Sequence, residues 1–444
     1  MTVRYITVTP VTNLFKPATR AFGDIAIVGV ADNDATGPMK APVPITNPDS
    51  ITFSSKTTLT ASVATAATTV DVAGHFGFPS ATPFKIRIGD EIMNVTALTA
   101  TSFTVTRAED GTTASTHDIG DQVTYTSKEK RVTDADWFKG ALGKSVRKCF
   151  EQKPGPTTVY AVRTDPAEGA NALSNALAEV GKLDVQIVAL ANTSLISNTL
   201  GKPEITSLSQ HVNTVSNIGG DGKERIGVAM LVKDAPAFDP NVLTGISNER
   251  MVMVAHKSDE DAAAAVAGTI AGYEPHISLL LKPVSLDMDG LFSDSEIDAL
   301  NTARVNWLTD PTLIPGKGLF MGEGYTLGAD IPYIDIIRTI DDVSFRLKAQ
   351  LIRSIGDLRV SRSGLRALVS QMTAVLEPLK QREVIEGYDV FLPLLVLLDK
   401  DPASLTDAEL QQINNAQNDR TVDAIVAVDY AGAIHRLNIT LKFE

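Results

Sequence analysis

Short apolar runs alternate with longer segments of helical periodicity between residues 157 and 308. The runs are rich in valine, isoleucine and alanine, as buried strands are, and the longer segments space their apolar residues by three or four positions. Strands are predicted at 157–163, 185–191, 225–232 and 250–256, and helices at 166–181, 203–217, 258–272 and 293–308. This alternation indicates a layered α/β domain and restricts the fold more than any other feature of the chain.

A different pattern interrupts this domain between residues 52 and 127, where threonine, alanine and valine are dense and charge is sparse. Strands are predicted at 57–63, 68–72, 84–88, 91–97, 102–107 and 122–126, with Gly, Asp and Pro between them. An apolar strand at 24–33 and a loop with four prolines at 37–50 precede the interruption, and a helix at 134–151 follows it. We therefore predict an α/β domain at 21–51 and 128–317 with an inserted all-β domain at 52–127.

The stretch 318–444 contains two amphipathic helices and no catalytic constellation, so we interpret it as an assembly domain. The first helix, at 332–355, has one apolar stripe made of Ile336, Ile340, Val343, Leu347, Leu351 and Ile355, and Gly356 is expected to end it. The second helix, at 362–379, is capped by Ser361 and has the stripe Leu365, Leu368, Val369, Met372, Val375, Leu376 and Leu379. Capping boxes are predicted at Ser293 with Glu296 and at Thr406 with Glu409, the latter opening a helix at 407–416.

Both ends of the chain carry short alternating segments that predict strands. The N-terminal arm, residues 1–20, begins with a β-rich run that Pro10 interrupts. The strand at 435–443 follows another strand candidate in VDAIVAVDY, so a strand pair is expected there. A terminal strand joins a sheet either in its own molecule or in a neighbour. We favour exchange with a neighbour through Val3, Tyr5, Thr7, Leu437, Ile439, Leu441 and Phe443.

Composition and charge argue against several functional classes. The net charge is −13, from 40 basic and 53 acidic residues, whereas a nucleic-acid-binding protein needs clustered Lys and Arg for phosphate contacts. The single cysteine, Cys149, cannot form an internal disulfide and is expected to be a buried structural thiol. No signal peptide is visible, and the apolar run at 391–398 is too short to span a bilayer, so synthesis in the cytoplasm without general secretion is expected.

No catalytic residue, cofactor site or metal site is predicted. GALGKS at 140–145 resembles the end of a phosphate-binding loop, but Phe138 stands where the motif needs its first glycine, and an ordinary helix is the better interpretation. The six histidines are scattered without metal-ligand spacing. Two interpretations remain for the basic cluster Arg353, Arg359, Arg362 and Arg366, which is either a solvated face or a surface for an acidic partner.

The order of these segments resembles that of the contractile phage tail sheath family, which includes the sheaths of related contractile injection systems. The resemblance is carried by DIAIVGVADNDATGPMKAPVPIT, LGKSVRKCFEQKPGPTTVYAVR, the stretch from AAAAVAGTIAGYEPH to NTARVNWL, and YIDIIRTIDDVSFRLKAQLIRSIG with the terminal strand. The inserted domain resembles a small domain of assorted phage virion proteins at Gly89, Glu91, Arg107, Gly111, Thr112, His117 and Gly120.

The resemblance implies a structural subunit of a virion tail, without enzymatic activity or cofactor, that assembles in the host cytoplasm. Sheath subunits stack as rings, expected to be hexameric, into a helical tube around an inner tail tube, between a baseplate and a tail terminator. Contraction drives the inner tube through the target envelope. Terminal arms add strands to the sheets of neighbours, the inserted domain is expected on the outer surface, and the arginine cluster is a candidate contact with the inner tube. Neither nucleic acid nor direct membrane insertion is implied.

Two other functions stay open at this point. One is a different virion structural protein, such as a tail-tube or baseplate component that shares the inserted domain. The other is an α/β enzyme with an inserted β-domain, because a fold does not by itself give a function. The lack of a recognisable catalytic motif in the sequence counts against the enzyme.

Overall fold

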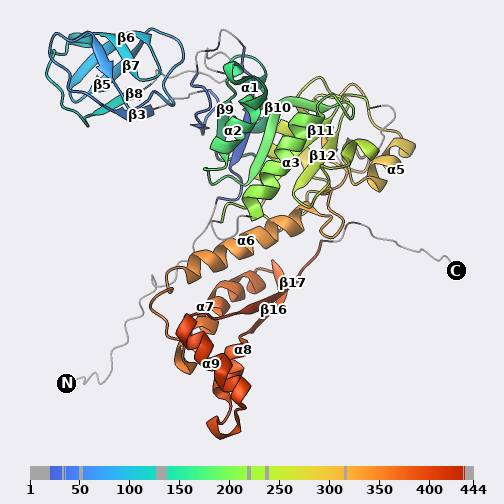
Figure 1. Ribbon diagram of the computed structural model, residues 1–444. Helices are drawn as coiled ribbons and strands as arrows, with labels where there is room; N and C mark the ends of the chain where they lie inside the picture. The colour runs from blue at the N-terminus through green and yellow to red at the C-terminus, as the bar shows by residue number, and fades with distance from the viewer. Residues whose placement is uncertain are drawn as a thin grey trace, which may run out of the picture. The chain divides into compact units, whose positions relative to one another are not determined.

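The computed structural model describes residues 21–32, 35, 37–49, 54–126, 138–217, 222–235, 240–314, 318–433 and 435 (Figure 1). The described residues fall into two compact units, one from Phe22 to Arg338 and the other from Thr339 onward. The boundary lies within one helix, α6 (Ile334–Leu351).

The first unit is built on a nine-stranded sheet with the order β13-β15-β14-β12-β11-β10-β1-β9-β2. The strands are β1 (Ile25–Gly29), β2 (Val43–Ile45), β9 (Val159–Arg163), β10 (Ile187–Leu195), β11 (Ile226–Leu231), β12 (Met251–Ala255), β13 (Pro283–Val284), β14 (Asn306–Thr309) and β15 (Leu319–Met321). The central pairs from β9 through β1, β10, β11 and β12 to β14 are parallel, and the short strands β2, β13 and β15 pair antiparallel.

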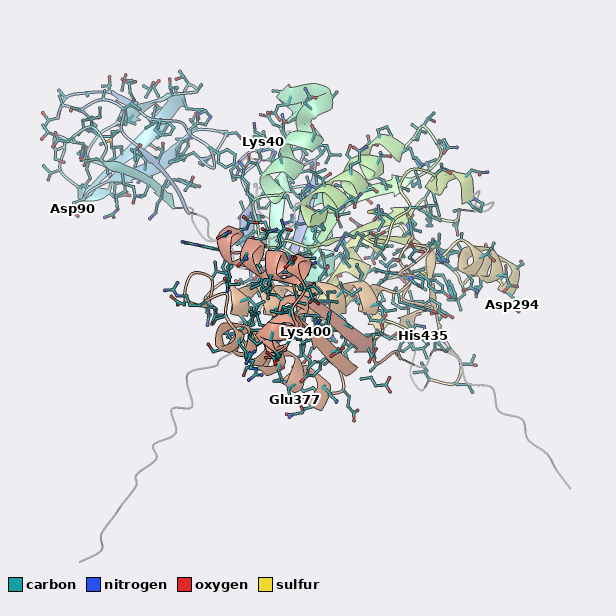
Figure 2. All side chains as sticks on the ribbon, turned by 60° about the horizontal axis from the view of Figure 1, so that its bottom comes forward. Lys40, Asp90, Asp294, Glu377, Lys400 and His435 are labelled. Carbon is teal, nitrogen blue, oxygen red and sulfur yellow. The ribbon has the colours of Figure 1, made fainter. Side chains whose placement is uncertain are left out.

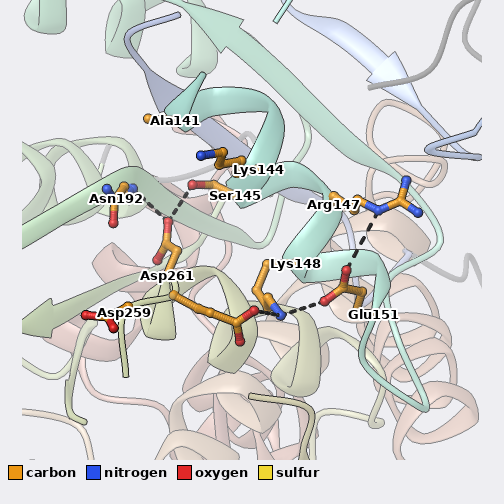
Figure 3. A pocket seen from close by; sticks show the side chains of 10 residues that line it. Ala141, Lys144, Ser145, Arg147, Lys148, Glu151, Asn192, Asp259 and Asp261 are labelled. Carbon is orange, nitrogen blue, oxygen red and sulfur yellow. Dashed lines mark hydrogen bonds and ion pairs between the residues drawn. The ribbon is translucent and has the colours of Figure 1, made fainter. Parts of the chain in front are cut away.

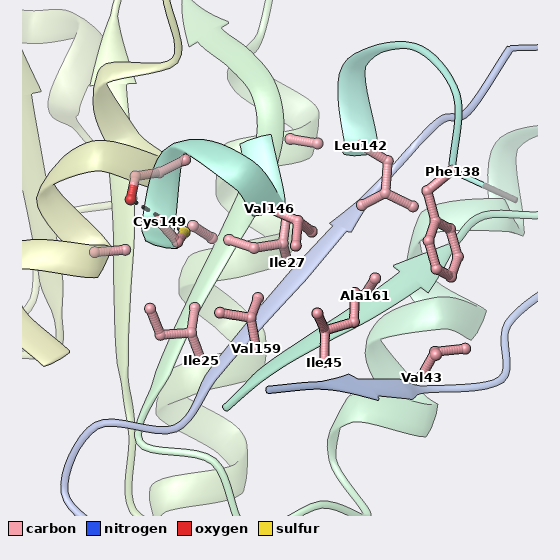
Figure 4. Packing of buried hydrophobic residues seen from close by; sticks show 14 of the residues in the cluster. Ile25, Ile27, Val43, Ile45, Phe138, Leu142, Val146, Cys149, Val159 and Ala161 are labelled. Atoms are coloured by element: carbon pink, nitrogen blue, oxygen red, sulfur yellow. Dashed lines mark hydrogen bonds between the residues drawn. The ribbon is translucent and has the colours of Figure 1, made fainter. Parts of the chain in front are cut away.

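Helices cover both faces of this sheet, as the alternation of strands and helices predicts. They are α1 (Ala141–Phe150), α2 (Ala172–Val180), α3 (Lys202–Asn217), α4 (Ala262–Ala271) and α5 (Asp294–Thr302). Ile25 and Ile27 of β1 belong to the core beside α1 and α4, whereas Ala26 and Val28 belong to the core beside α2 and α3 (Figure 4). Because successive side chains of a strand point to opposite faces, one apolar strand supplies both cores.

The helix α4 consists almost entirely of small residues, AAAAVAGTIA, and all ten are buried. A side chain at Gly268 would lie 2.5 Å from the carbonyl oxygen of Cys149, so the absence of a Cβ there allows α1 and α4 to pack closely. The Cys149 thiol is fully buried and donates to the carbonyl of Ala264 at 3.2 Å. This burial confirms the predicted buried thiol, and it also raises the pKa of Cys149.

The stretch between β2 and α1 forms a separate six-stranded antiparallel sheet with the order β3-β8-β5-β6-β7-β4. Its strands are β3 (Ser54–Thr58), β4 (Thr69–Asp71), β5 (Phe84–Ile88), β6 (Glu91–Leu98), β7 (Ser102–Thr106) and β8 (Gln122–Thr126). Phe84 anchors its aromatic core, with ring centroids 5.9 Å from Phe103 and 5.5 Å from Tyr125. The predicted strands agree with these except the first, which occupies 54–58 rather than 57–63.

One buried carboxylate, that of Glu91, organises one end of this small sheet. Its side chain is 0% exposed and accepts hydrogen bonds from Arg107 at 2.6 and 2.7 Å and from the Ser115 amide at 3.1 Å, while the His117 ring lies 2.8 Å away. Burial opposes ionisation, but the hydrogen bonds from Arg107, Ser115 and His117 outweigh it and lower the pKa of Glu91 to about 2. Glu91, Arg107 and His117 were among the residues that carried the resemblance of this domain to virion proteins.

The second unit contains α6 from Thr339 onward, a short 3-10 helix (Pro402–Ser404) and five longer elements. These are α7 (Arg362–Gln381), β16 (Ile385–Phe391), α8 (Pro393–Asp399), α9 (Asp407–Asp419) and β17 (Ile425–Tyr430). The Ser361 hydroxyl accepts from the Gly364 amide and caps α7, as predicted. Both predicted capping boxes, at Ser293 with Glu296 and at Thr406 with Glu409, are present.

Some predicted boundaries differ from those in the structure for local reasons. The helix predicted at 134–151 begins at Ala141, because Gly140 has a positive φ of 97°. The helix predicted at 293–308 ends at Thr302, and the chain turns at Arg304, with a φ of 55°, before forming β14. The expected C-terminal domain at 318–444 includes β15, yet β15 pairs with β13 and β14 of the large sheet. The second unit therefore starts at Thr339.

The apolar stripe predicted for the helix at 332–355 is only partly buried. The helix ends at Leu351, ahead of Gly356, and Ile355 lies beyond it with 78% of its surface exposed. Ile340 is 44% exposed, whereas Val343 is buried. The stripe of α7 agrees better, since Leu365, Met372, Val375, Leu376 and Leu379 are all buried.

Replacing Glu91 with Gln should destabilise the six-stranded sheet by about 3–5 kcal/mol, because Arg107 then keeps its buried charge without a counter-charge. Amide hydrogen exchange of β5 to β8 should accelerate accordingly. The matched control is Glu109→Gln, whose side chain is 31% exposed and lies 3.9 Å from Lys85. It should leave exchange in the same strands unchanged.

The Glu91→Gln variant should also lose a pH dependence. The folded-state pKa of Glu91, about 2, is below its ordinary value of 4.5, so its stabilising contribution is present above pH 4.5 and disappears as the pH falls toward 2. The loss amounts to about 3 kcal/mol in the unaltered protein. Equal acid sensitivity of exchange in the two proteins contradicts this role for Glu91.

Candidate assembly surface

The second unit carries a two-stranded antiparallel sheet made of β16 and β17. Glu383, with a φ of 57°, and a hydrogen bond from the Val384 amide to the Leu379 carbonyl (3.0 Å) turn the chain from α7 directly into β16. The pairing register runs from Ile385 opposite Tyr430 to Phe391 opposite Ile425, with a bulge near Gly387. The sequence predicted β17, but it gave β17 the terminal segment as its partner and did not identify β16 as a strand.

One face of this sheet packs on helices α6 and α7. Val343, Leu376, Leu379, Val384 and Ile385 form the buried cluster, with Tyr388, Val390, Val426 and Val428 partly buried against it. The Tyr388 hydroxyl donates to Glu377 of α7, whose position is labelled in Figure 2, at 2.8 Å. A two-stranded sheet is marginal alone, so these helices provide the support that keeps the strands in place.

Both long edges of the sheet lack a strand partner among the described residues. No residue of β17 is fully buried, since its side chains alternate between exposed and half-buried along the whole strand. Even the inward-facing Val426 and Val428 are only partly covered. An edge of this kind presents a row of backbone N–H and C=O groups that a further strand can pair with.

The outer face of the sheet is acidic at one end and apolar at the other. Asp429 lies opposite Gly387, and Asp389 lies opposite Ala427, while Phe391 and Ile425 form the last pair. Phe391 is 45% exposed and Ile425 is 58% exposed. The carboxylate of Asp429 extends over Gly387, where a Cβ atom would lie 2.9 Å from it. This face is not evident from the sequence, because it arises from the pairing of two strands whose facing residues Phe391 and Ile425 are 34 positions apart in the chain.

The structure divides the four arginines that sequence analysis grouped. Arg362 and Arg366 lie on the first turns of α7 and form ion pairs with Asp399 of α8, both at 3.0 Å. Arg353 and Arg359 lie in the turn between α6 and α7, are exposed, and make no ion pair with any described residue. Ile352 and Ile355 of the same turn are 67% and 78% exposed. The turn is thus an exposed tip that is both apolar and basic.

The predicted exchange residues Val3, Tyr5, Thr7, Leu437, Ile439, Leu441 and Phe443 lie outside the described residues. The chain after β17 is described only at 431–433 and 435, where it is neither helix nor strand. The structure therefore describes the sheet that a terminal strand could join, but not the terminal strands themselves.

A polar hollow of about 360 Å³ lies at the start of α1 (Figure 3). This is the position of GALGKS, the segment that resembles the end of a phosphate-binding loop but lacks its first glycine. The carboxylate of Asp261 in this hollow accepts hydrogen bonds from the Ser145 hydroxyl at 2.6 Å and from the backbone N–H of Asn192 at 2.7 Å. Asp261 also caps α4. Lys148 lies between Glu151 and Glu260, at 2.6 and 2.7 Å. These side chains form their hydrogen bonds and ion pairs with one another, so we interpret the hollow as an internal polar network.

No group of His, Cys, Asp and Glu side chains in the described ranges is arranged to hold a metal ion. Among the helices that the structure describes, none combines the length and the apolar character that crossing a membrane requires.

The fold is similar to that of solved contractile sheaths. No family model matches the chain, and no curated protein matches it in sequence. The sheath of the anti-feeding prophage, solved as a helical sheath in the contracted state, matches 98% of this chain and 99% of its own with a TM-score of 0.52 and 14% identity. The sheath complex of an extracellular contractile injection system, PVC, in the contracted state covers 69% of this chain and 81% of its own (TM-score 0.49, 14% identity). A sheath tail protein from Listeria innocua covers 94% and 96% (TM-score 0.45, 12% identity).

The similarity to the anti-feeding prophage sheath shows that this chain has the fold of a contractile sheath protein. It confirms the α/β fold class predicted from the sequence, and it extends over nearly the whole of both chains. At this level of identity the similarity concerns the fold.

Replacing Leu376 with Ala should destabilise the second unit by about 2–5 kcal/mol, because the side chain is fully buried beneath β16 and β17. Amide exchange in both strands should accelerate. Leu410→Ala on α9 is the matched control, since Leu410 is 42% exposed and its loss should cost much less. Equal effects of the two substitutions would show that α7 does not support the sheet.

Proposed function

We propose that this chain is the structural subunit of a contractile sheath, which polymerises as a helical tube around an inner tube and contracts to drive that tube through a target cell envelope. The observation that supports this function best is the similarity of fold, over 98% of the chain, to a protein solved as a helical sheath in the contracted state. The proposed role is structural, with neither an enzymatic activity nor a cofactor. Its place is the tail of a virion or of an injection device.

The proposed assembly is a helical stack of rings of identical subunits, with six subunits expected in each ring by resemblance to the family. Heterologous contacts between copies generate open helical assemblies of this kind. The inner tail tube protein, a baseplate and a tail terminator are the further proposed partners. Contraction is proposed to release free energy as interfaces repack between rigid subunits, so no nucleotide is required.

The proposed link between neighbouring subunits is the addition of terminal strands to the open sheet of β16 and β17. The arm at 1–20 and the strand at 435–443 are the proposed donors. The two unpaired edges among the described residues, and the incomplete burial of β17, support this assignment of the acceptor. Backbone hydrogen bonds would keep each subunit tied to its neighbours while the rigid parts move.

Electron microscopy of the purified chain, alone and with its tube protein, tests the proposed function. We expect hollow helical tubes or rods, because subunits with open edges polymerise at high concentration. Removing residues 1–10 or 435–444 should leave a folded, soluble subunit that forms no tubes, since backbone pairing between copies is lost. Circular dichroism checks the fold, and sedimentation checks assembly.

Two results argue against this proposal. A small oligomer of uniform size under all conditions is inconsistent with a sheath subunit. Tubes formed by both truncated chains are inconsistent with strand exchange as the link, while leaving the sheath function itself intact.

The proposed contact with the inner tube is the tip between α6 and α7. Of the four arginines first considered, Arg353 and Arg359 are available, whereas Arg362 and Arg366 already pair with Asp399. The exposed Ile352 and Ile355 beside them add apolar surface. A basic and apolar tip suits an acidic partner surface with apolar spots.

Reversing both free charges, as Arg353→Glu with Arg359→Glu, should weaken co-sedimentation with preassembled tubes about tenfold at low salt. The subunit should stay folded, because neither side chain pairs with a described residue. Lys380→Glu, an exposed charge reversal on α7, is the control and should bind normally. If the control weakens binding as much as the tip variant, the effect is one of total charge and not of the tip.

A further inference from the structure

We propose that the outward face of the six-stranded sheet is a binding surface for an acidic polysaccharide, with Lys56 and Arg87 as the residues that hold its carboxylate groups. This function goes beyond the proposed sheath and does not depend on it. The surface is formed by β3, β8 and β5, which are adjacent in the sheet (Figure 1).

The two faces of these three strands differ in composition. The inward face is buried and apolar, and it includes Ile86 and Ile88 of β5 and Val123 of β8. Because side chains alternate along a strand, the residues between these share the opposite face. Those with described side chains are Lys56, Thr58, Lys85, Arg87, Gln122 and Thr124. This outward face therefore has basic and neutral polar residues but no acidic one, although the whole chain has a net charge of −13.

Lys56 and Arg87 lie on either side of Thr124. The register places Lys56 opposite Thr124 in the pair of β3 and β8, and Arg87 opposite Thr124 in the pair of β5 and β8. Thr124 is short, and its hydroxyl donates to the Arg87 carbonyl at 3.3 Å, so it does not fill the space between the two long side chains. The backbones of β3 and β5 are about 10 Å apart, which is twice the usual strand spacing. The two cations therefore border one gap.

These two cations have no counter-ion within the part of the chain that the structure describes. Neither Lys56 nor Arg87 forms an ion pair or a side-chain hydrogen bond with a described residue. Lys85, on the same strand as Arg87, shows the contrast, since it pairs with Asp110 and lies 3.9 Å from Glu109. The excess positive charge of this face is thus at Lys56 and Arg87, where an anion would neutralise it.

Protection of a sheet edge does not account for both residues. β3 is the outermost strand of the sheet, and a lysine on an edge strand opposes pairing with other chains. β5, however, lies between β8 and β6, with a hydrogen-bonded strand on each side. Arg87 therefore protects no edge, and its place beside Lys56 across Thr124 favours a ligand.

The rest of the surface favours a carbohydrate over other anionic polymers. Apart from the cations, it offers the hydroxyl of Thr58 and the amide of Gln122, which both donate and accept hydrogen bonds as sugar hydroxyls do. Nucleic acid needs clustered cations or, when single-stranded, aromatic side chains on which bases stack, and no described side chain of this face is aromatic. A membrane surface needs large apolar side chains that insert, and the described side chains of this face include none.

Carboxylates suit the type and spacing of the two cations. An arginine fork binds one carboxylate through two parallel hydrogen bonds, whereas a lysine acts as a point charge. Since the strands that carry Arg87 and Lys56 are about 10 Å apart, each cation can bind its own singly charged group. A polymer with carboxylates on successive sugars provides such groups in series, and two weak contacts with one polymer act together.

Binding of sodium polygalacturonate to the full chain, immobilised at low density so that copies do not assemble, tests this inference. We expect surface plasmon resonance to show binding that weakens as salt is added, because exposed charges are screened. Lys56→Gln with Arg87→Gln should weaken it about tenfold at low salt, as the loss of two exposed ion pairs would. Arg87→Lys should weaken it about threefold, since the charge stays but the fork is lost.

The matched control is Lys144→Gln with Lys153→Gln, which also removes two exposed cations that form no ion pair with a described residue. It should change binding by less than about twofold, because both charges are outside the six-stranded sheet. Amide exchange in β5 and β8 should be the same in all variants, since Lys56 and Arg87 are exposed.

The outcomes decide the inference without bearing on whether the chain assembles as a sheath. It is overturned by a lack of polygalacturonate binding at low salt, by binding that the paired Lys56→Gln and Arg87→Gln substitutions leave unchanged, or by an equal loss in the control. Methyl-esterified polygalacturonate that binds as tightly as the acid form shows that carboxylates are not recognised, and phosphorylated mannan or duplex DNA that binds as tightly shows general attraction of polyanions. Either result also overturns it. Loss confined to the Lys56 and Arg87 variants, with the methyl ester unbound, establishes it.

Discussion

The open edges of the sheet of β16 and β17 are the main physical constraint on this structure. Backbone N–H and C=O groups at an edge bind water until another strand pairs with them, so a long open edge favours association. The nine-stranded sheet keeps this tendency small, because its outermost strands β2 and β13 have only three and two residues. The sheet of β16 and β17 has strands of seven and six residues and no further strand among the described residues. Between these two sheets, the longer open edges among the described residues thus belong to the sheet of the second unit.

In the first unit, by contrast, buried polar groups form hydrogen bonds within the unit itself. Asn306 is fully buried, and its side chain bonds to the Met253 carbonyl and to both backbone groups of Tyr325, at 2.6 to 3.1 Å. The fully buried Arg225 donates to the carbonyls of Val180 and Leu183 at 2.9 and 2.8 Å. Breaking such contacts leaves buried polar groups unsatisfied, which costs about 1–3 kcal/mol each. These contacts oppose deformation within the unit, which is what the proposed contraction requires of its subunits.

The sequence predicts those features that depend on local pattern. Alternating strands and helices give the layered α/β fold, and the capping boxes at Ser293 and Thr406 mark the starts of α5 and α9. Features that depend on contacts between residues far apart in the chain are not predicted. The strand β16 is hidden because Gly387 and the bulge beside it interrupt the alternation of apolar residues. Arg362 and Arg366 look equivalent to Arg353 in the sequence, yet Asp399 of α8, more than thirty residues away, pairs with only the first two.

The hydrogen-bond network around Glu91 in the six-stranded sheet likewise could not be predicted from the sequence. Glu91, Arg107 and His117 carried the resemblance of this stretch to virion proteins, but the sequence alone assigned them no chemistry. The structure explains them by burial: strand β6 places Glu91 inward, and only Arg107, His117 and backbone amides can satisfy its charge there. The network accounts for Glu91, Arg107 and His117 by their contribution to the stability of this sheet.

The acidic face of β16 and β17 differs from that network because its charges have no internal explanation. Buried charges such as Glu91 are held by partners within the chain, whereas Asp389 and Asp429 repel each other across an exposed face. A surface ion pair contributes only about 0.2–1 kcal/mol, which is too little to hold two subunits together. Backbone hydrogen bonds and buried apolar area, rather than exposed charge, would therefore have to supply most of the free energy of any contact made at this sheet.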